Sequence, residues 1–301
     1  MSAHPLPYRG RQVALATMHR KDEAIAPALM AALGLSVVNA PELDTDQLGT
    51  FAGEIPRRGN MLDTAIAKAR MGMEAAGLPL GIASEGSFGP HPLIPFFPGG
   101  IELMVFIDDE RGIVVHETLV ADETNFSHRV VAPADAIDDF LKRVGFPTHG
   151  LIVRPSVEPS VGASVGASTP AGAIHHNIVK GITTRAALDA AIEFAARVSL
   201  DGKAHIETDM RAHMNPTRMR SLATLAEQLG QRLAEECTAC GSPGWGRVSV
   251  IKGLRCEECG TPTEMVLTEV FGCVACAHRE ERPRRDGLTY ASPAQCPICN
   301  P

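Results

Sequence analysis

Apolar and polar residues recur with two different periods along the chain, which predicts a mixture of strands and helices. A short apolar run over residues 12–16 is typical of a buried strand. The segment after it carries Ile25, Leu29 and Leu33 at intervals of four, the spacing of one helix face. A second apolar run, residues 36–38, follows this helix directly. The amino-terminal part is therefore predicted to be a βαβ unit.

Residues that cap or end helices mark the boundaries of the next elements. Asp22 precedes the first helical stretch and is a predicted N-cap, and Gly34 is a natural helix end. A second stretch, residues 62–77, has an apolar stripe at helical spacing and closes at Gly77. The apolar run after it ends at Glu85. A buried strand is therefore predicted to finish at this carboxylate, which raises the question of what Glu85 faces.

Strand and helix patterns continue as far as residue 236. Residues 102–120 predict a hairpin of two long strands. Two strand-like runs, 150–155 and 175–182, flank a charge-poor segment with a repeated Val-Gly-Ala-Ser unit, and this segment, residues 156–173, predicts a flexible insertion loop. Amphipathic patterns predict three further helices over residues 133–145, 183–199 and 217–236. The predicted fold class is therefore α/β with a mixed sheet, followed by a small cysteine-rich domain.

Length, composition and charge narrow the classes of protein. At 301 residues, with 45% hydrophobic and 21% charged residues, the chain has the make-up of a globular protein rather than of a disordered one. No apolar stretch reaches the ~20 residues that span a bilayer, and the amino terminus lacks the apolar core of a secretory signal. We therefore expect a cytoplasmic protein without a membrane partner. A net charge of −7 argues against broad affinity for nucleic acid.

All eight cysteines lie in the carboxyl-terminal region, in four Cys-x-x-Cys pairs. They are Cys237, Cys240, Cys256, Cys259, Cys273, Cys276, Cys296 and Cys299. Each pair turns the backbone so that two thiolates point at one ion, and two pairs complete a tetrahedral zinc shell. Disulfides are one alternative, which a cytoplasmic location disfavours, and iron–sulfur binding is another, which this regular pairing suits less well. The pattern predicts two structural Zn2+ ions, with no open coordination position for chemistry.

The spacing leaves open which pairs share an ion. If pairs that are neighbours in the sequence share an ion, the first with the second and the third with the fourth, they would form two small zinc ribbons. Interleaved pairing is the alternative. Residues 231–301 hold eight Lys and Arg against nine Asp and Glu, and thiolates add negative charge. We therefore expect a stabilising module or one that docks a protein, with nucleic acid less favoured. A basic cluster keeps the nucleic-acid alternative open; it comprises Arg279, Arg282, Arg284 and Arg285.

Polar residues with the chemistry of a phosphate site follow the first two predicted strands. Thr17, His19 and Lys21 lie between the first strand and its helix, at the sheet edge where α/β proteins bind ligands. A loop with a cation at a helix N-terminus is suited to bind phosphate. Further acidic and basic residues follow in chain order, namely Glu54, Arg57, Arg58, Lys68 and Glu85.

This order resembles the inosine triphosphate pyrophosphatase superfamily, whose members hydrolyse noncanonical nucleoside triphosphates. The resemblance covers roughly residues 12–89, about a quarter of the chain, and consists of a strand with a basic loop, a Gly-Glu-x-x-Arg segment, an Ala-x-x-Lys-Ala helix and an apolar strand that ends in acid and glycine. The chain departs from the family in its first loop, where the lysine comes one residue early and His19 stands at the asparagine position. The Ser-His-Arg letters at residues 127–129 come earlier than in the purine enzymes.

The resemblance implies a role for each matching residue. Glu54 and Glu85 would hold a Mg2+ ion and, with Lys68, would be catalytic. Thr17, His19, Lys21 and Arg57 would bind the triphosphate, and Phe88 would stack on the base. Together with the helix and cysteine patterns, the resemblance predicts a nucleotide-hydrolase-like domain over residues 1–202, a connector with a long helix over 203–236, and a double zinc-binding ribbon domain over 237–301.

Two functions follow from these observations. The first is a metal-dependent hydrolase that releases pyrophosphate from nucleoside triphosphates and carries a zinc-ribbon tail. The second is a non-catalytic interaction protein, with a degenerate hydrolase fold, whose ribbons dock a protein or nucleic acid. Residues 205–218 are dense in ionisable and amide side chains, among them Glu207, Asp209, Arg211, His213, Asn215 and Arg218. Of the two interpretations of this segment, an ion-pair lock between domains is favoured over the wall of a site.

Overall fold

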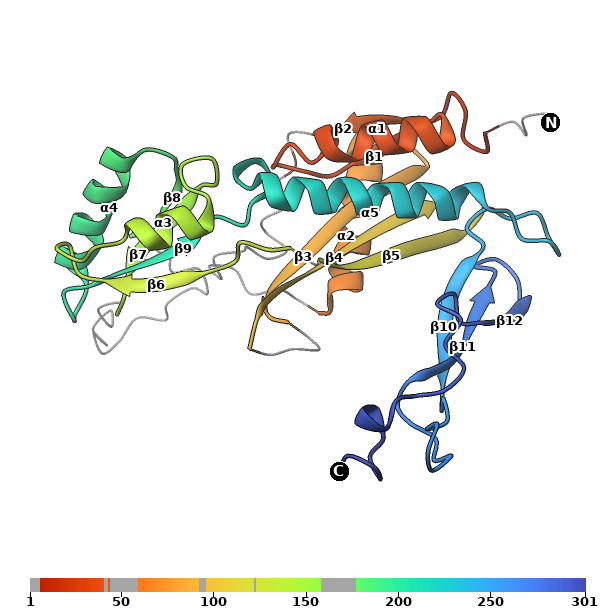
Figure 1. Ribbon diagram of the computed structural model, residues 1–301. Coiled ribbons are helices and arrows are strands. Elements are labelled where there is room, and N and C mark those ends of the chain that lie inside the picture. The colour runs from red at the N-terminus through yellow and green to blue at the C-terminus, as the bar shows by residue number, and fades with distance from the viewer. Residues whose placement is uncertain (1–5, 41–42, 44–58, 92–95, 122, 158–176) are drawn as a thin grey trace, which may run out of the picture.

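The computed structural model describes residues 6–40, 43, 59–91, 96–121, 123–157 and 177–301. It has three β-sheets with five helices around two of them, and it ends in the cysteine-rich region (Figure 1). The mixed α/β class predicted from the sequence is confirmed. No helix among the described residues is both long and apolar enough to cross a membrane.

The first sheet has five strands in the order β2-β1-β3-β4-β5. Its strands are β1 (Gln12–Leu15), β2 (Ser36–Asn39), β3 (Leu80–Pro90), β4 (Pro98–Asp108) and β5 (Ile113–Ala121). Both β2 and β3 run parallel to β1, whereas β3, β4 and β5 form an antiparallel meander. The predicted βαβ unit and the long hairpin are both present.

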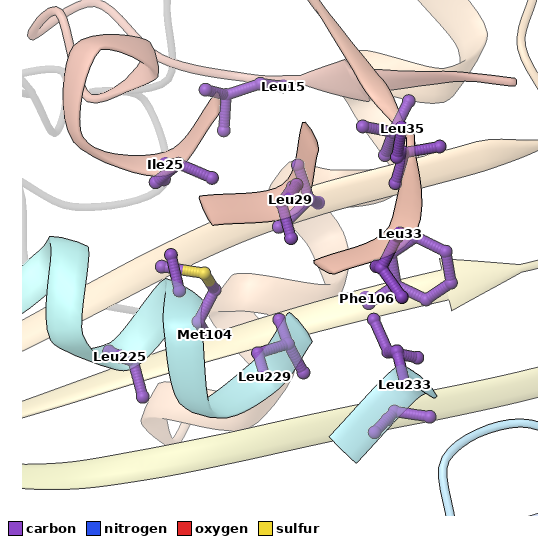
Figure 2. Close-up of a cluster of buried hydrophobic side chains, with 14 of the residues drawn as sticks. Leu15, Ile25, Leu29, Leu33, Leu35, Met104, Phe106, Leu225, Leu229 and Leu233 are labelled. Carbon is purple, nitrogen blue, oxygen red and sulfur yellow. The ribbon is translucent and has the colours of Figure 1, made fainter. Parts of the chain in front are cut away.

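Helices cover both faces of this sheet. They are α1 (Asp22–Leu33), α2 (Met61–Ala76) and α5 (Pro216–Ala234). Helices α1 and α5 lie side by side on one face, where Leu29 and Leu229 meet Met104 of β4 in the main hydrophobic core (Figure 2). On the other face, alanines of α2 pack against Ala83 and Val105. Glycines end α1 and α2 as predicted, with φ of 66° at Gly34 and 64° at Gly77.

The second sheet has the order β6-β9-β7-β8 and is antiparallel throughout. Its strands are β6 (His128–Val131), β7 (Leu151–Pro155), β8 (Val179–Ile182) and β9 (Ala204–Thr208), and its helices are α3 (Asp138–Val144) and α4 (Arg185–Val198). The two helices pack on one face of the sheet through the apolar stripes seen in the sequence. The strands predicted on either side of the insertion are confirmed; residues 158–173 of the insertion, together with residues 174–176, lie outside the described residues.

The segment predicted as a connector, residues 203–236, belongs to two different cores. Its first part is β9, which lies between β6 and β7 in the second sheet. Its long helix, α5, lines the core of the first sheet with Leu222, Leu225 and Leu229 (Figures 1 and 2). The sequence suggested a connector because β9 (AHIET) is short and half polar, so it carries little periodic signal.

The third sheet is the ribbon at the carboxyl terminus, with strands β10 (Gly246–Lys252), β11 (Val266–Gly272) and β12 (Arg279–Pro283) in that order. It projects beside β5 and the end of α5 (Figure 1). A small cluster of Cys237, Trp245, Phe271 and Cys273 forms its core. Most other ribbon side chains are exposed, so this small sheet has little apolar area with which to hold its fold.

Glu85 does not end its strand. β3 continues to Pro90 because β4 pairs with it along its whole length, from Leu80 opposite Asp108 to Pro90 opposite Pro98. The shorter β1 stops at Leu15, opposite Ile82. Residues 84–86 therefore project beyond the end of β1, and the loop that follows β1 occupies the space beside them.

Candidate functional site

The loop between β1 and α1 directs a lysine into the protein. Helix α1 begins at Asp22, and Lys21 rather than Asp22 is its N-cap residue. The preceding Arg20 has a φ of 54°, a left-handed conformation that residues other than glycine seldom adopt. Lys21 is buried, and its Nζ donates hydrogen bonds to the Ser84 carbonyl at 2.8 Å and to Ser84 Oγ at 3.1 Å. A strained turn thus places a cation beside the projecting part of β3.

Lys68 of α2 answers the question of what Glu85 faces. Both side chains are buried, and Lys68 Nζ lies 2.5 Å from Glu85 Oε1. They meet because odd-numbered residues of β3 point to the face that α2 covers, and Lys68 lies on α2 between Ala65 and Ala69, which pack there. The structure therefore brings together three of the residues predicted for the site: Lys21, Lys68 and Glu85.

Burial and neighbouring charges perturb Lys21. Burial and, after it, the positive charge of Arg218 lower the pKa of Lys21 to about 8, although the carboxylates of Glu85 and Glu102 act in the opposite direction. The ammonium is therefore held as a cation at neutral pH at a cost in free energy. A bound anion would remove much of this cost.

A second buried ion pair, which the sequence did not predict, adjoins this group. Arg218 at the start of α5 donates from Nε to Glu102 Oε1 at 2.6 Å and from Nη2 to Glu102 Oε2 at 3.2 Å, and both side chains are fully buried. Arg218 also donates to the Met210 carbonyl. The sequence did contain a signal for this ion pair: Glu102 is a charged residue in the largely apolar strand β4, and a buried charge requires a partner of opposite charge. The segment 205–218 therefore forms a buried ion pair with the first sheet.

The same segment also lies against the β1–α1 loop. The rings of His213 and His19 are stacked with centroids 5.1 Å apart. Burial lowers the pKa of His19 to about 3, and the charge of Lys21 acts in the same direction. His19 is thus a neutral donor and acceptor at physiological pH. Thr17 Oγ1 accepts a hydrogen bond from the His19 backbone N–H at 3.1 Å and so fixes the loop.

Phe88, predicted to stack on a base, lies at the edge of this group. The Arg218 guanidinium sits over its ring at 5.3 Å from the centroid. A row of aromatic rings continues from it into the second sheet: Phe88 and Phe126 at 6.4 Å, Phe126 and His128 at 6.3 Å, and His128 and His205 at 5.3 Å. The predicted residues Glu54, Arg57 and Arg58 lie outside the described residues.

The eight cysteines form two sets of four, and their pairing is interleaved. The first and third Cys-x-x-Cys pairs make one set, Cys237, Cys240, Cys273 and Cys276. The second and fourth make the other, Cys256, Cys259, Cys296 and Cys299. Sequential pairing, the first of the two possibilities raised by the sequence, is therefore wrong. The spacing along the chain could not decide the pairing. β11 lies in the sequence between the second and third Cys-x-x-Cys pairs, and because it folds back along β10 it brings together pairs that are far apart in the sequence.

The sulfur atoms of each set have the spacing of a tetrahedral metal site. Within the first set, Sγ atoms lie 3.9 Å apart for Cys237 and Cys276 and 3.6 Å apart for Cys240 and Cys273. A tetrahedral zinc–thiolate shell with 2.3 Å bonds has edges of about 3.8 Å. A disulfide requires about 2.05 Å, and all eight thiols are free. Within the part of the chain that the structure describes, only these two sets bring together three or more metal-ligating side chains.

Comparison with known proteins gives a family but no activity. A family model described as a domain of unknown function, DUF6671, matches residues 68–301, which is more than half of the chain. The match begins at Lys68 and includes Glu85, Arg218 and all eight cysteines. No curated protein matches the sequence.

Proposed function

Because the chain belongs to the family described as domain of unknown function DUF6671, we propose its function from the site: metal-dependent hydrolysis of nucleoside triphosphates with release of pyrophosphate. The observation that carries this proposal is the convergence of Lys21, Lys68 and Glu85 beside β3, just beyond the carboxyl end of β1. These residues come from three separate elements, and they are the ones that resemble the inosine triphosphate pyrophosphatase superfamily.

The charge of the group suits an anionic substrate. Lys21, Lys68 and Arg218 are three cations, Glu85 and Glu102 are two carboxylates, and one positive charge is therefore in excess. A triphosphate close to Lys21 and Lys68 would be held by ammonium groups that lose little hydration, because they are already buried. The neutral imidazole of His19 can donate or accept a hydrogen bond, as the amide at the matching position of the family does.

The described residues do not by themselves make a magnesium site. Glu85 forms an ion pair with Lys68, and among the described residues it belongs to no group of three or more metal-ligating side chains. The proposed ion would depend on Glu54, outside the described residues, and on substrate phosphates. When bound, Mg2+ would neutralise phosphate charge and activate water. Glu85 and Lys68 then have separable roles: the carboxylate orients the ion or the water, and the ammonium binds phosphate.

We propose that both cysteine sets hold structural Zn2+. Four thiolates at tetrahedral spacing leave no open position for substrate. One set lies beside Trp245 and Phe271 in the ribbon core, and the other has Cys259 and Cys299 exposed. Zinc would supply the folding free energy that so small an apolar core lacks.

The test is pyrophosphate release from inosine, xanthosine and the common nucleoside triphosphates, with Mg2+ or Mn2+. Glu85→Gln keeps the shape of the side chain and removes its charge, so we expect turnover to fall by about 100-fold or more. Lys68→Ala should weaken triphosphate binding. The control is Glu74→Gln on the exposed side of α2, which should leave turnover unchanged.

The alternative is an interaction protein without catalysis. It is favoured by the way the buried charges satisfy one another, Glu85 with Lys68 and Glu102 with Arg218, as they do in a purely structural network. If the wild type neither hydrolyses nor binds any of these triphosphates in the presence of Mg2+ or Mn2+, the enzyme proposal fails and this alternative replaces it.

A further inference from the structure

A cleft of about 590 Å3 separates the first sheet from the ribbon. One wall is residues 117–120 of β5 with the last turns of α5, and the other is a face of the ribbon sheet. None of the described residues of the triphosphate site lines this cleft. The cleft is therefore distinct from the proposed active site.

The β5 wall presents backbone groups. β5 is the last strand of its sheet, and among the described residues it pairs only with β4. Arg232 of α5 donates from Nη1 to the His116 carbonyl at 2.9 Å, so this carbonyl is accessible from the cleft side. Peptide groups alternate between the two edges of a strand, and Thr118 and Val120 therefore turn their N–H and C=O groups to the same edge as His116. Such an edge can pair with another strand.

The ribbon wall presents guanidinium groups. Arg247, Arg282 and Arg285 have side chains 57%, 45% and 76% exposed. They surround Phe271, with Arg282 at 4.4 Å and Arg285 at 5.5 Å from the ring centroid. Glu269 is bound by Arg247 at 2.9 Å and lies 3.5 Å from Arg285, and Arg282 binds Glu280 at 2.6 Å.

The residues that line the cleft include one more arginine than glutamate, and Arg285 is the most exposed of these arginines. The lining contains four arginines and three glutamates, with Glu280 outside the lining bound to Arg282, although the chain has a net charge of −7. Two of these glutamates, Glu117 and Glu269, are already bound by Arg232 and Arg247. An acidic ligand is thus favoured at this place on an otherwise acidic molecule.

We propose that this cleft binds an extended acidic segment of a partner protein, which adds as a strand to the edge of β5. The strand edge provides hydrogen bonds to the segment's backbone, and Arg282 and Arg285 bind its carboxylates. Four residues of β5 line the cleft, so the bound stretch is about four residues at ~3.4 Å each. Nucleic acid fits less well, because it has no backbone groups that pair with a strand edge and because residues 231–301 are on balance acidic.

The test uses the full chain and a fluorophore-labelled peptide of three Glu-Val repeats. The comparisons are the same peptide with Lys in place of each Glu, and oligo-uridine RNA. We expect the acidic peptide alone to bind, by fluorescence anisotropy, and to slow hydrogen exchange at the amides of Thr118 and Val120. Binding should weaken at higher salt, since the arginines on the ribbon wall are exposed.

Two variants with matched controls separate backbone pairing from charge. Thr118→Pro removes an edge N–H that does not bond within the sheet, and should weaken binding at least about tenfold. Val114→Pro makes the same change on the same edge outside the cleft and should bind normally. Arg285→Glu should weaken binding at least about tenfold, whereas Arg220→Glu, an exposed charge reversal elsewhere, should not.

Several results would overturn the proposal. They are no binding of the acidic peptide at millimolar concentration, equal binding of the Lys peptide, stronger binding of RNA, and an unchanged affinity in Thr118→Pro. Dimers formed through β5, detected as a doubled mass that Thr118→Pro abolishes, would make a second copy of the chain the occupant instead. None of these outcomes depends on pyrophosphate release.

Discussion

At the scale of single residues, the site is defined by charged side chains that are buried in the protein. Lys21, Lys68, Glu85, Glu102 and Arg218 are all buried. A buried ion pair repays its desolvation only when its geometry and its other hydrogen bonds are good. Glu102 and Arg218 meet that condition through two hydrogen bonds. Lys21 is satisfied chiefly by neutral oxygen atoms of Ser84, which makes it the residue whose charge is least compensated.

Lys21 should therefore leave a signature in the pH dependence of stability. Its pKa is 10.5 when unperturbed and about 8 in the fold. Between these values the unfolded chain binds more protons than the folded chain, so this residue makes the protein more stable as pH rises through the window. Lys21→Met removes this contribution. In urea unfolding, the stability of Lys21→Met relative to wild type should fall by roughly 2–3 kcal/mol between pH 7.5 and pH 10.5.

A bound triphosphate provides the control for this interpretation. An anion beside Lys21 raises its pKa toward the ordinary value, so the pH-dependent difference should shrink when a nonhydrolysable triphosphate is present. A difference that stays constant from pH 7.5 to pH 10.5 would mean that the ammonium is solvated rather than buried.

At the scale of elements, the pair of Glu102 and Arg218 fixes the start of α5 against β4. Removing the guanidinium in Arg218→Met leaves a buried carboxylate without compensation, and the free energy of unfolding should fall by about 3–5 kcal/mol. The double variant Arg218→Met with Glu102→Leu should recover most of this loss, because two apolar side chains can replace a buried pair. Urea unfolding of the three proteins measures both effects.

The control lies on the same helix. Arg220 is 65% exposed, and Arg220→Met should change the free energy of unfolding by no more than about 0.5 kcal/mol. If the double variant is as unstable as Arg218→Met, then the hydrogen bond from Arg218 to the Met210 carbonyl, and not the ion pair, is the contact that matters.

The elements that the sequence predicted correctly are those whose start and end are determined by residues within the element itself. Helices α1 and α2 have a regular apolar stripe and a glycine at φ near 65°, so their sequence alone determines where they end. β3 was predicted five residues too short because Gly86 to Pro90 have no strand pattern of their own; they are extended because β4 pairs with them. Strands β6 and β9 were missed for the same reason.

The site was predicted in part, again for reasons of locality. Lys21, Lys68 and Glu85 follow recognisable elements in a recognisable order. The partner of Glu102 lies 116 residues away at Arg218, and the stacking of His19 on His213 depends on how α5 packs. Such contacts are products of tertiary packing and have no pattern in the chain.

At the scale of the whole molecule, three sheets are joined by a chain that returns to its first core. After the second sheet, α5 comes back to lie along α1, and the ribbon extends from its end (Figure 1). In the sequence, the second sheet is therefore inserted between two segments that belong to the first core, β1 to β5 and α5. The ribbon has no such return, and the two cysteine sets take the place of a large apolar core.

Interleaved pairing makes the two cysteine sets unequal, and this can be measured. Cys237→Ser disrupts the set in the ribbon core, next to Trp245 and Phe271, so we expect faster hydrogen exchange across most of residues 237–301. Cys256→Ser disrupts the other set, whose partners are Cys296 and Cys299. Faster exchange should then be confined to residues near 253–265 and 284–301, while β10 to β12 near the first set stay protected.

Metal content and the first sheet provide the remaining controls for the same variants. Elemental analysis should find two zinc ions per chain in the wild type and one in each cysteine variant, and Ser249→Ala on exposed β10 should keep both. Exchange in β1 to β5 should be unchanged in every variant, because their core contains no cysteine. Loss of protection around Cys237 and Cys240 in Cys256→Ser would instead indicate sequential pairing in solution. Wild-type protein with no bound metal and with its thiols paired as disulfides would exclude zinc, and the stability of the ribbon would then have to come from covalent cross-links.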